Sequence, residues 1–329
     1  MTGDRLPPRA LGSTGLTVSR IGLGLAALGR PAYINLERAR DFGTDRTIAA
    51  FERRSHEMLD AAYAAGIRYV DAARSYGMAE AFLGSWLTTR GLPRDALTIG
   101  SKWGYTYVGA WRIDAPAQET KDLSVDTLRR QIVESRALLG DRLRLYQIHS
   151  ATLDSGVLED AAVVDELHRL RAGGLAIGLT VSGPGQSDTI RRALAVEVNG
   201  EHLFQVIQAT WNLLEPSAGA ALAEAKASGW GVIIKEALAN GRLTDRGAAE
   251  QVIAVRQRAA ALGTTTDALA LAAALSQPWA DVVLSGAATI AQLHSHLNAM
   301  RLAALPTPWP AIAEPPAEYW AARGRLAWN

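Results

Sequence analysis

The chain alternates short apolar runs with longer amphipathic segments. Eight runs of six to eight residues are rich in aliphatic side chains and carry a glycine or a polar residue at or near their ends, which is typical of buried strands. These predicted strands are 20–26, 67–72, 97–102, 143–149, 175–182, 203–209, 231–237 and 282–287. Between them the apolar positions follow a helical period, for example at 56–66 and 248–263, and several segments end in glycine.

This alternation predicts parallel strands joined by right-handed helical crossovers. Eight such units without a Pro/Gly/Ser-rich linker predict an α/β protein: one (β/α)8 TIM barrel that spans residues 1–329 as a single domain. The alternative is a doubly wound dinucleotide-binding sheet. Residues 21–30, IGLGLAALGR, only approach its Gly-x-Gly-x-x-Gly pattern and lack the acid expected about 20 residues later.

Composition narrows the class of partner. Apolar residues make up 48% of the chain, and 34 basic residues nearly cancel 33 acidic ones, so we expect small-molecule partners, no nucleic acid and no membrane. The sequence has no cysteine, and it shows neither a signal peptide nor an apolar stretch near the roughly 20 residues that span a bilayer. We therefore expect a cytoplasmic location. The oligomeric state is not readable from these patterns.

Four ionisable residues fall where a barrel enzyme has its chemistry, at the carboxyl ends of strands. Asp71 ends the second predicted strand and Tyr76 follows it, whereas Lys102 and His149 end the third and fourth. A lysine beside a phenol favours the phenolate and lowers its pKa from about 10, and an aspartate keeps that lysine charged. A histidine can donate a hydrogen bond to a carbonyl oxygen. The set suits proton exchange at an oxygen whose carbon gains or loses hydride.

The same residues lie in motifs of a known family. Residues 71–84, DAARSYGMAEAFLG, resemble the aldo-keto reductase signature, and SK at 101–102, YQIH at 146–149 and RALGSTGLTVSRIGLG at 9–24 resemble that family too. The resemblance implies a (β/α)8 barrel with a C-terminal loop over the active site. It also implies an NAD(P)(H)-dependent carbonyl reductase or alcohol dehydrogenase, with Tyr76 as proton donor, Lys102 and Asp71 as its tuning pair, and His149 orienting the carbonyl.

The resemblance also implies a cofactor site along the strand ends. Its residues are Gly24, Leu25, Ser182, Gln208, Lys235, Leu238, Asn240, Gly241, Arg242, Ser285, Gly286, Thr289 and Gln292. The turn at 238–243 allows close approach of a pyrophosphate, and the amides at 285–294 suit the adenosine half. NADP(H) is favoured because the family prefers it. NAD(H) stays open, because Ala288 is apolar and His296 replaces the usual asparagine.

Two further positions, near the end of the seventh predicted strand, depart from the family pattern. Lys235 stands where an aromatic ring usually stacks on the nicotinamide, and Glu236 stands where a serine is usual. One interpretation is that the two side chains pair with each other or with neighbours, and that Trp211 or Trp103 supplies the ring. The other is that Lys235 lies near the nicotinamide and weakens binding of its oxidised, cationic form.

The substrate pocket is predicted from aromatic residues and long connections. Trp103, Tyr105 and Trp111 follow the catalytic lysine and could stack on a ring or a sugar, and the connection at 29–55 is long enough for a pocket wall. An aldehyde, a ketone and a sugar fit this pattern equally well. A non-catalytic nucleotide sensor on the same fold is the alternative function. A metal site is not expected, because only one of six histidines, His149, ends a predicted strand.

Overall fold

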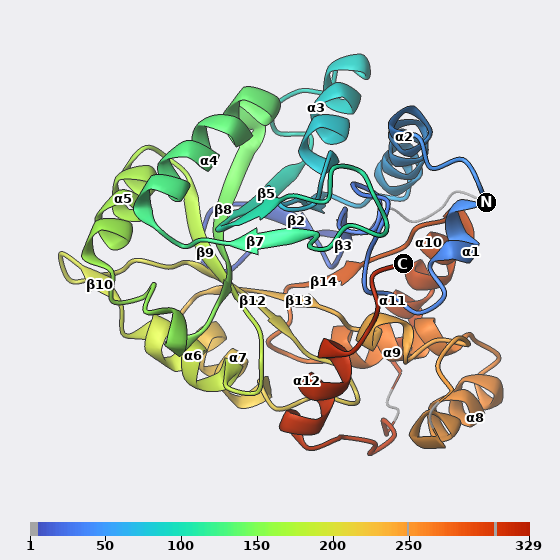
Figure 1. Cartoon of the computed structure of the whole chain (residues 1–329). Coiled ribbons are helices and arrows are strands. Elements are labelled where there is room, and N and C mark those ends of the chain that lie inside the picture. The colour runs from blue at the N-terminus through green and yellow to red at the C-terminus, as the bar shows by residue number, and fades with distance from the viewer. Residues whose placement is uncertain (1–5, 249, 306–307) are drawn as a thin grey trace.

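The computed structural model describes residues 6–248, 250–305 and 308–329. Eight parallel strands close into a barrel in the order β12-β13-β14-β3-β4-β5-β8-β9 (Figure 1). Their bounds are β3 Ile21–Gly24, β4 Tyr69–Asp71, β5 Thr98–Trp103, β8 Leu143–Ala151, β9 Ala176–Val181, β12 Val206–Thr210, β13 Gly231–Lys235 and β14 Val282–Ser285. Each lies in one of the eight predicted runs, or extends it by one or two residues, so the (β/α)8 prediction is confirmed.

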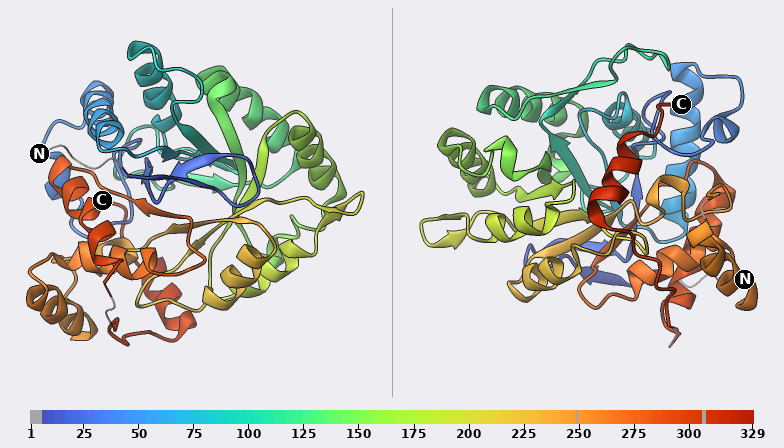
Figure 2. Two further views of the ribbon diagram at one scale, coloured as in Figure 1. Left: turned by 180° about the vertical axis from the view of Figure 1, so that it is seen from behind. Right: turned by 60° about the horizontal axis from the view of Figure 1, so that its bottom comes forward.

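Helices surround the barrel (Figures 1 and 2). They are α1 Ala39–Phe42, α2 Ile48–Ala64, α3 Ala79–Thr89, α4 Val125–Leu139, α5 Ala161–Ala172, α6 Gln186–Leu194, α7 Gly219–Ala227, α8 Ile253–Ala261, α9 Thr266–Leu275, α10 Ile290–Leu297, α11 Ala299–Leu302 and α12 Pro316–Gly324. Short 3-10 helices are Gly140–Arg142, Leu153–Ser155, Ala239–Gly241 and Glu250–Val252. Side chains of Ser124, Asp160 and Thr265 cap the amino ends of α4, α5 and α9, which fixes where these helices begin.

Two predicted helices have different bounds in the structure. The helix expected from residue 56 begins at Ile48, because the Thr47 side chain caps it by accepting from the Ala50 amide at 3.2 Å. The connection after β3 is shorter than predicted for the same reason, and it contains α1. The segment 248–263 divides into a 3-10 turn and α8, and its residue 249 lies outside the described residues.

A two-stranded hairpin covers one end of the barrel. Strands β1 (Pro8–Ala10) and β2 (Thr17–Ser19) pair antiparallel and lie across the barrel in the view from behind (Figure 2). Leu11 and Val18 of the hairpin region are fully buried and pack into a cluster with Tyr69. Gly12 has a φ of +52°, and a Cβ there would lie 2.2 Å from the Gly231 amide nitrogen. The hairpin therefore seals the end where the strands begin.

The opposite end carries the longer connections. A second hairpin, β6 (Tyr105–Tyr107) with β7 (Glu119–Lys121), follows β5 at this end, whereas the small hairpin β10 (Glu197–Val198) with β11 (Glu201–His202) precedes β12 and lies at the end where the strands begin. Helix α12 and the C-terminal segment lie on the side that faces the viewer in Figure 1. The β6–β7 hairpin, α12 and the C-terminal segment build a wall around the carboxyl ends of the strands.

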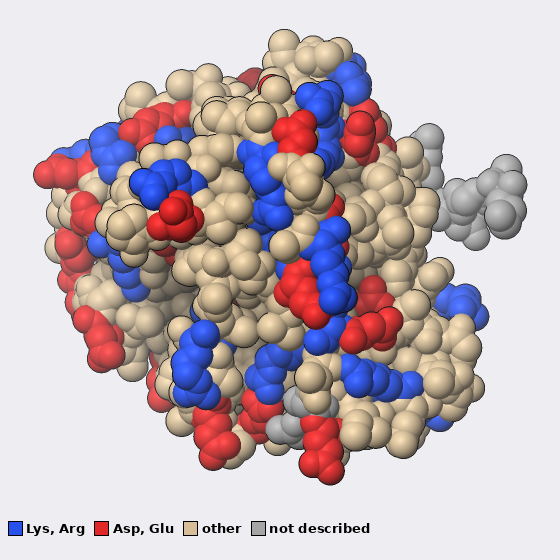
Figure 3. Space-filling model, turned by 45° about the vertical axis from the view of Figure 1, so that its right-hand side comes forward, with Lys and Arg blue, Asp and Glu red and all other residues tan. Residues whose placement is uncertain are grey.

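Charges of both signs are mixed on the surface. On the face in Figure 3, basic and acidic side chains lie next to each other instead of collecting into a field of one sign. Many of them form ion pairs, such as Arg191 with Glu224 at 2.8 Å. None of the described helices has the length and apolar character that crossing a membrane requires.

Candidate active site

A cavity of about 640 Å³ opens at the carboxyl ends of the barrel strands. Most of the residues predicted to form the site line it. They are Gly24, Asp71, Tyr76, Tyr105, His149, Ser182, Gln208, Lys235, Leu238, Asn240, Gly241, Ser285, Gly286 and Gln292. Gly324, Leu326 and Trp328 of the C-terminal segment also line the cavity, so this segment borders the site as expected.

Lys102 contacts two of the other three predicted catalytic residues, Asp71 and Tyr76, and the backbone. Its ammonium forms an ion pair with Asp71 and donates to the Tyr76 hydroxyl at 3.1 Å and to the Ala72 carbonyl at 2.9 Å. Lys102 and Asp71 are 1% and 2% exposed, so each charge depends on the other for compensation. The adjacent strands β4 and β5 bring these residues together, because parallel strands end at one edge.

Asp71 also holds two uncharged groups. One of its carboxylate oxygens accepts from the Tyr69 hydroxyl at 3.1 Å and from the side-chain amide of Gln208 at 2.9 Å. Three donors, one of them the Lys102 ammonium, therefore hold the carboxylate of Asp71 in place. Gln208, expected as a contact of the nicotinamide amide, is 1% exposed and directs its NH2 group to Asp71 while bordering the cavity.

The acidity of Tyr76 differs from the sequence expectation. Burial raises its pKa well above 10, and the nearby carboxylate of Asp71 raises it further, whereas the Arg30 guanidinium acts in the opposite direction. The expected net lowering of this pKa is therefore wrong for the protein as described. The phenol is protonated at neutral pH, which suits a proton donor. The Lys102 ammonium is in place to stabilise the phenolate that remains after donation.

His149 lies beside Tyr76 with its ring nearly perpendicular. The ring centroids are 5.6 Å apart at 83°, and Tyr105 packs on the other side with its centroid at 4.8 Å. Burial and the Lys102 charge lower the pKa of His149 well below 6.5. Its imidazole is thus neutral at physiological pH and retains one N–H for donation to a carbonyl oxygen.

Arg30 is a second cation over the Tyr76 ring, and no sequence motif predicted it. Its guanidinium carbon lies 5.3 Å from the Tyr76 ring centroid and 4.6 Å from that of Trp328. It is 2% exposed and donates to the Ser75 carbonyl at 2.9 Å and to Glu119 at 2.8 Å. The only signal for it was the length of the connection at 29–55, which does form part of the cavity wall.

Lys235 and Glu236 do not form a direct pair. Lys235 donates to the Thr210 hydroxyl at 2.9 Å, and that hydroxyl donates to Glu236 at 3.1 Å. Glu236 forms an ion pair with Arg323 of α12 at 2.5 Å. Burial lowers the pKa of Lys235 to about 8. Burial alone would raise the pKa of Glu236, but the charges of Arg323 and Lys235 lower it to about 2.

Three predicted cofactor contacts lie outside the cavity lining, and each has a local reason. Leu25 is 1% exposed and packs in the core beside Gly24. Arg242 forms a bidentate ion pair with Glu314 of the C-terminal segment. The Thr289 hydroxyl caps α10 by accepting from the Gln292 amide at 3.2 Å. These three contacts stay predictions without a place in the cavity wall, whereas Arg246, four residues after Arg242, does line the cavity.

The tryptophans predicted to face the substrate or the nicotinamide belong to the helix layer. Trp103 follows the inward-pointing Lys102 on β5, so its side chain points the other way, and it is 0% exposed. Trp111 packs edge-on against Phe51, with centroids 5.3 Å apart. Trp211 packs against Trp279. None of the three lines the cavity, and the aromatic side chains that do are Tyr33, Tyr76, Tyr105 and Trp328.

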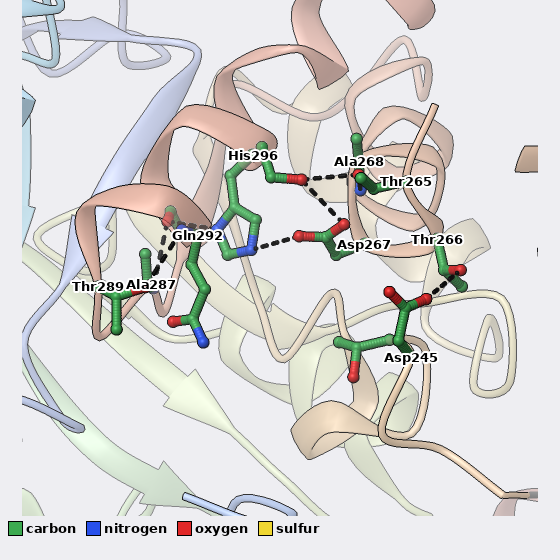
Figure 4. Close-up of polar contacts among 12 residues, drawn as sticks. Asp245, Thr265, Thr266, Asp267, Ala268, Ala287, Thr289, Gln292 and His296 are labelled. Atoms are coloured by element: carbon green, nitrogen blue, oxygen red, sulfur yellow. Dashed lines mark hydrogen bonds and ion pairs between the residues drawn. The ribbon is translucent and has the colours of Figure 1, made fainter. Parts of the chain in front are cut away.

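A network of side chains forms the part of the cavity near α9 and α10 (Figure 4). The Ser285 hydroxyl lies 2.7 Å from Nδ1 of His296, and Nε2 of His296 lies 3.3 Å from Asp267. Asp267 also accepts from the Ser295 hydroxyl at 3.0 Å. Sequence reasoning noted His296 but missed Asp267, because the capped start of α9 resembles that of an ordinary helix. No cluster of three or more potential metal ligands occurs among the described residues.

A profile described as "Aldo/keto reductase family" matches residues 20–308. D-threo-aldose 1-dehydrogenase of Pseudomonas sp is 30% identical over 210 residues, which are 56% of this chain and 56% of that protein. NADH-specific methylglyoxal reductase of Escherichia coli (strain K12) is 26% identical over 211 residues, 62% of this chain and 59% of that protein. The chain thus spans less than two thirds of these curated relatives.

Solved structures agree with this assignment. A putative aldo-keto reductase from Pseudomonas aeruginosa has a TM-score of 0.64 and 25% identity, covering 91% of this chain and 98% of that one. An aldo-keto reductase from Bacillus halodurans in its holo form has a TM-score of 0.68, with 98% and 97% of the two chains covered, and at 21% identity it speaks for the fold alone. The barrel and the matched profile together place this chain in the aldo-keto reductase family.

Proposed function

We propose that this protein transfers hydride between a nicotinamide nucleotide and the carbonyl or alcohol carbon of a small molecule, with Tyr76 exchanging the proton. The contact that carries this proposal is the Lys102 ammonium between the Asp71 carboxylate and the Tyr76 hydroxyl, 3.1 Å from the latter, beside a cavity. A bound nicotinamide nucleotide supplies or accepts the hydride; the protein supplies the proton and the orientation.

The roles of the side chains follow from their protonation states. In reduction, the neutral phenol of Tyr76 donates its proton to the substrate oxygen, and the Lys102 charge stabilises the phenolate. Solvent then restores the proton. Neutral His149 donates a hydrogen bond to the same oxygen and fixes its position. In oxidation the same groups act in reverse, and Tyr76 receives the hydroxyl proton.

The cavity has features that fit a dinucleotide. It extends from Tyr76 and His149 past Lys235 and Asn240 to Ser285 and beyond. Asn240 is 6% exposed, and its side-chain oxygen Oδ1 has no partner among the described residues, so a polar ligand can satisfy it. We propose Gly24, Ser182, Gln208, Leu238, Gly241, Gly286 and Gln292 as further walls of the nucleotide site.

The substrate is proposed to be an aldehyde, a ketone or a sugar. Names of relatives supply three starting points: a D-threo-aldose, an aryl alcohol, as in the NADP(+) aryl-alcohol dehydrogenase of Phanerodontia chrysosporium, and methylglyoxal. Tyr105 and Trp328 provide aromatic walls near Tyr76, and Arg30 and Glu119 provide polar ones.

The test is a panel of these compounds with both nucleotides, in which turnover is followed by the nicotinamide absorbance. We expect turnover with wild-type protein and its loss in Tyr76→Phe. Binding of nucleotide without turnover across a broad carbonyl panel would instead identify a nucleotide sensor.

A further inference from the structure

Building on the proposed function, we infer that the protein uses NAD(H) in preference to NADP(H), because carboxylates of Asp267 and Asp245 line the adenosine end of its cavity. This differs from the sequence expectation, which favoured NADP(H) from the family. The inference depends on the side chains around α9 and α10 and on their charge.

The direction of the nucleotide follows from the chemistry. Hydride transfer requires the nicotinamide near Tyr76, so the adenosine half must take the part of the cavity away from it. That part is formed by the segment after β13, the start of α9 and helix α10, and it includes Asp245, Asp267 and, in the last turn of α10, His296. In Figure 4 these three side chains come from separate elements and lie around one region.

Asp267 is held as an anion. Burial alone would raise its pKa, but hydrogen bonds from His296 and Thr265 hold it well below the usual range. The Ala287 amide donates to Ser285 at 3.3 Å, the Ser285 hydroxyl can donate to Nδ1 of His296, and Nε2–H then donates to Asp267. The Asp267 carboxylate therefore stays ionised within this network and faces the cavity.

Asp245 adds a second carboxylate nearby in the wall. It accepts from the Thr266 hydroxyl at 2.9 Å, next to Asp267 in the sequence. Among the described residues, neither Asp245 nor Asp267 has a lysine or arginine within ion-pair distance. The local field therefore disfavours an added phosphate.

The arginines that could have bound a phosphate are engaged elsewhere. Arg246 lines the cavity, but both of its terminal nitrogens bind Asp41, one of them at 2.8 Å. Arg38 also lines it and directs its donors to the backbone carbonyls of residues 27, 30 and 31. Arg242 is paired with Glu314. A 2′-phosphate would have to displace one of these partners before it gained a cation.

A ribose hydroxyl and a 2′-phosphate respond to this wall in opposite ways. The 2′-hydroxyl of NAD can donate a hydrogen bond to a carboxylate, whereas the 2′-phosphate of NADP brings nearly two negative charges that such a wall repels. At an effective dielectric constant near 20, repulsion between close charges is sufficient for a preference of about tenfold or more.

Direct nucleotide binding tests the inference. Isothermal titration of the full chain with NAD⁺ and with NADP⁺ should give a dissociation constant about tenfold lower for NAD⁺. Asp267→Asn should reduce that ratio at least threefold, mainly by improving NADP⁺ binding. Asp141→Asn, an exposed carboxylate before β8, is the matched control and should leave the ratio unchanged. Asp245→Asn should act in the same direction as Asp267→Asn.

The outcomes separate this inference from the proposed function. If wild type binds NADP⁺ as tightly as NAD⁺ or more tightly, the inference is overturned while the oxidoreductase function stands. If neither nucleotide binds, the proposed function fails as well. Thermal melting of the variants shows whether they are folded, and should Asp267→Asn not fold, the wild-type ratio and Asp245→Asn still decide the question.

Discussion

The two ends of the cavity differ in how they are built. Around Tyr76 a buried cation, Lys102, is shared by an acid and a phenol, and the donors come from adjacent strands. Around Asp267 a histidine and hydroxyl groups hold the acid, and the donors come from helices. The first end is arranged to move a proton, whereas the second is arranged to keep one charge fixed. If the proposed function is correct, one barrel face combines chemistry with selection of the ligand.

The largest expected effect comes from a substitution at the Tyr76 end of the cavity that leaves the other end intact. Tyr76→Phe removes the hydroxyl, and we expect turnover to fall about a thousandfold, within the range for a lost general acid. The nucleotide dissociation constants should stay within twofold. Tyr107→Phe, in which the lost hydroxyl accepts from the Trp111 amide away from the cavity, is the control and should retain activity. Parallel losses in both variants would contradict the comparison.

The next effect concerns stability at the same end. Lys102→Met leaves the Asp71 carboxylate, 2% exposed, without its cation, and removing one partner of a buried pair costs about 3–5 kcal/mol of unfolding free energy. Urea denaturation measures the loss. The double variant Asp71→Asn/Lys102→Met should recover part of it, because it also removes the stranded charge. If the double variant is less stable than Lys102→Met, Asp71 is not the partner that matters.

Glu236 should make the stability of the protein depend on pH. Its pKa in the folded protein is about 2, below the ordinary 4.5, so its contribution to stability is fully present above pH 4.5 and is lost as the pH falls through 2. The shift corresponds to about 3 kcal/mol at neutral pH. Glu236→Gln should therefore be less stable than wild type at pH 7, and the gap should narrow toward pH 2.

A surface pair provides the control for Glu236. Glu224 binds Arg191 at 2.8 Å, but its side chain is 47% exposed. Glu224→Gln should cost less than about 1 kcal/mol, as exposed ion pairs do. Equal losses for the two substitutions would mean that the link between Glu236 and Arg323 of α12 does not depend on burial.

The smallest expected effect concerns the charge of Lys235 and its influence on nucleotide binding. With a pKa of about 8, its ammonium is mostly charged at pH 7 and mostly neutral at pH 9. A cation opposes oxidised nicotinamide, so oxidised nucleotide should bind severalfold better, relative to reduced, as the pH rises across this interval. Lys235→Met should show the high-pH ratio at both pH values. A ratio that does not change with pH in wild type would place Lys235 away from the nicotinamide.

The catalytic end was predictable because its residues follow strand ends within short motifs. The period of the apolar positions identified all eight strands, and parallel strands must end together, so Asp71, Lys102 and His149 could be placed at one rim. The errors arose where the neighbours were distant in sequence. The partner of Arg242, Glu314, lies in the C-terminal segment, and nothing near Arg242 announces it.

The adenosine end was not predictable for a related reason. In the sequence, Asp267 is an ordinary acid in the first turn of α9. Its contact with His296 of α10, which in turn contacts Ser285 of β14, arises only in the folded chain. The misplaced tryptophans show a different limit. Trp103 was predicted to face the site because it directly follows Lys102 in the sequence. Side chains alternate along a strand, so Trp103 on β5 points to the face opposite Lys102.

The hairpin that seals the start of the strands lies on the far side of the barrel from all of these groups. A side chain at Gly12 would collide with the backbone of β13 at its first residue, whereas the cavity walls are set at the other end of the same strand. Melting temperature can thus be tuned at this floor while the affinity for ligands is left alone. A series of substitutions at this hairpin should change the melting temperature in steps. Heat inactivation across the series would then report unfolding, because the cavity walls are unchanged.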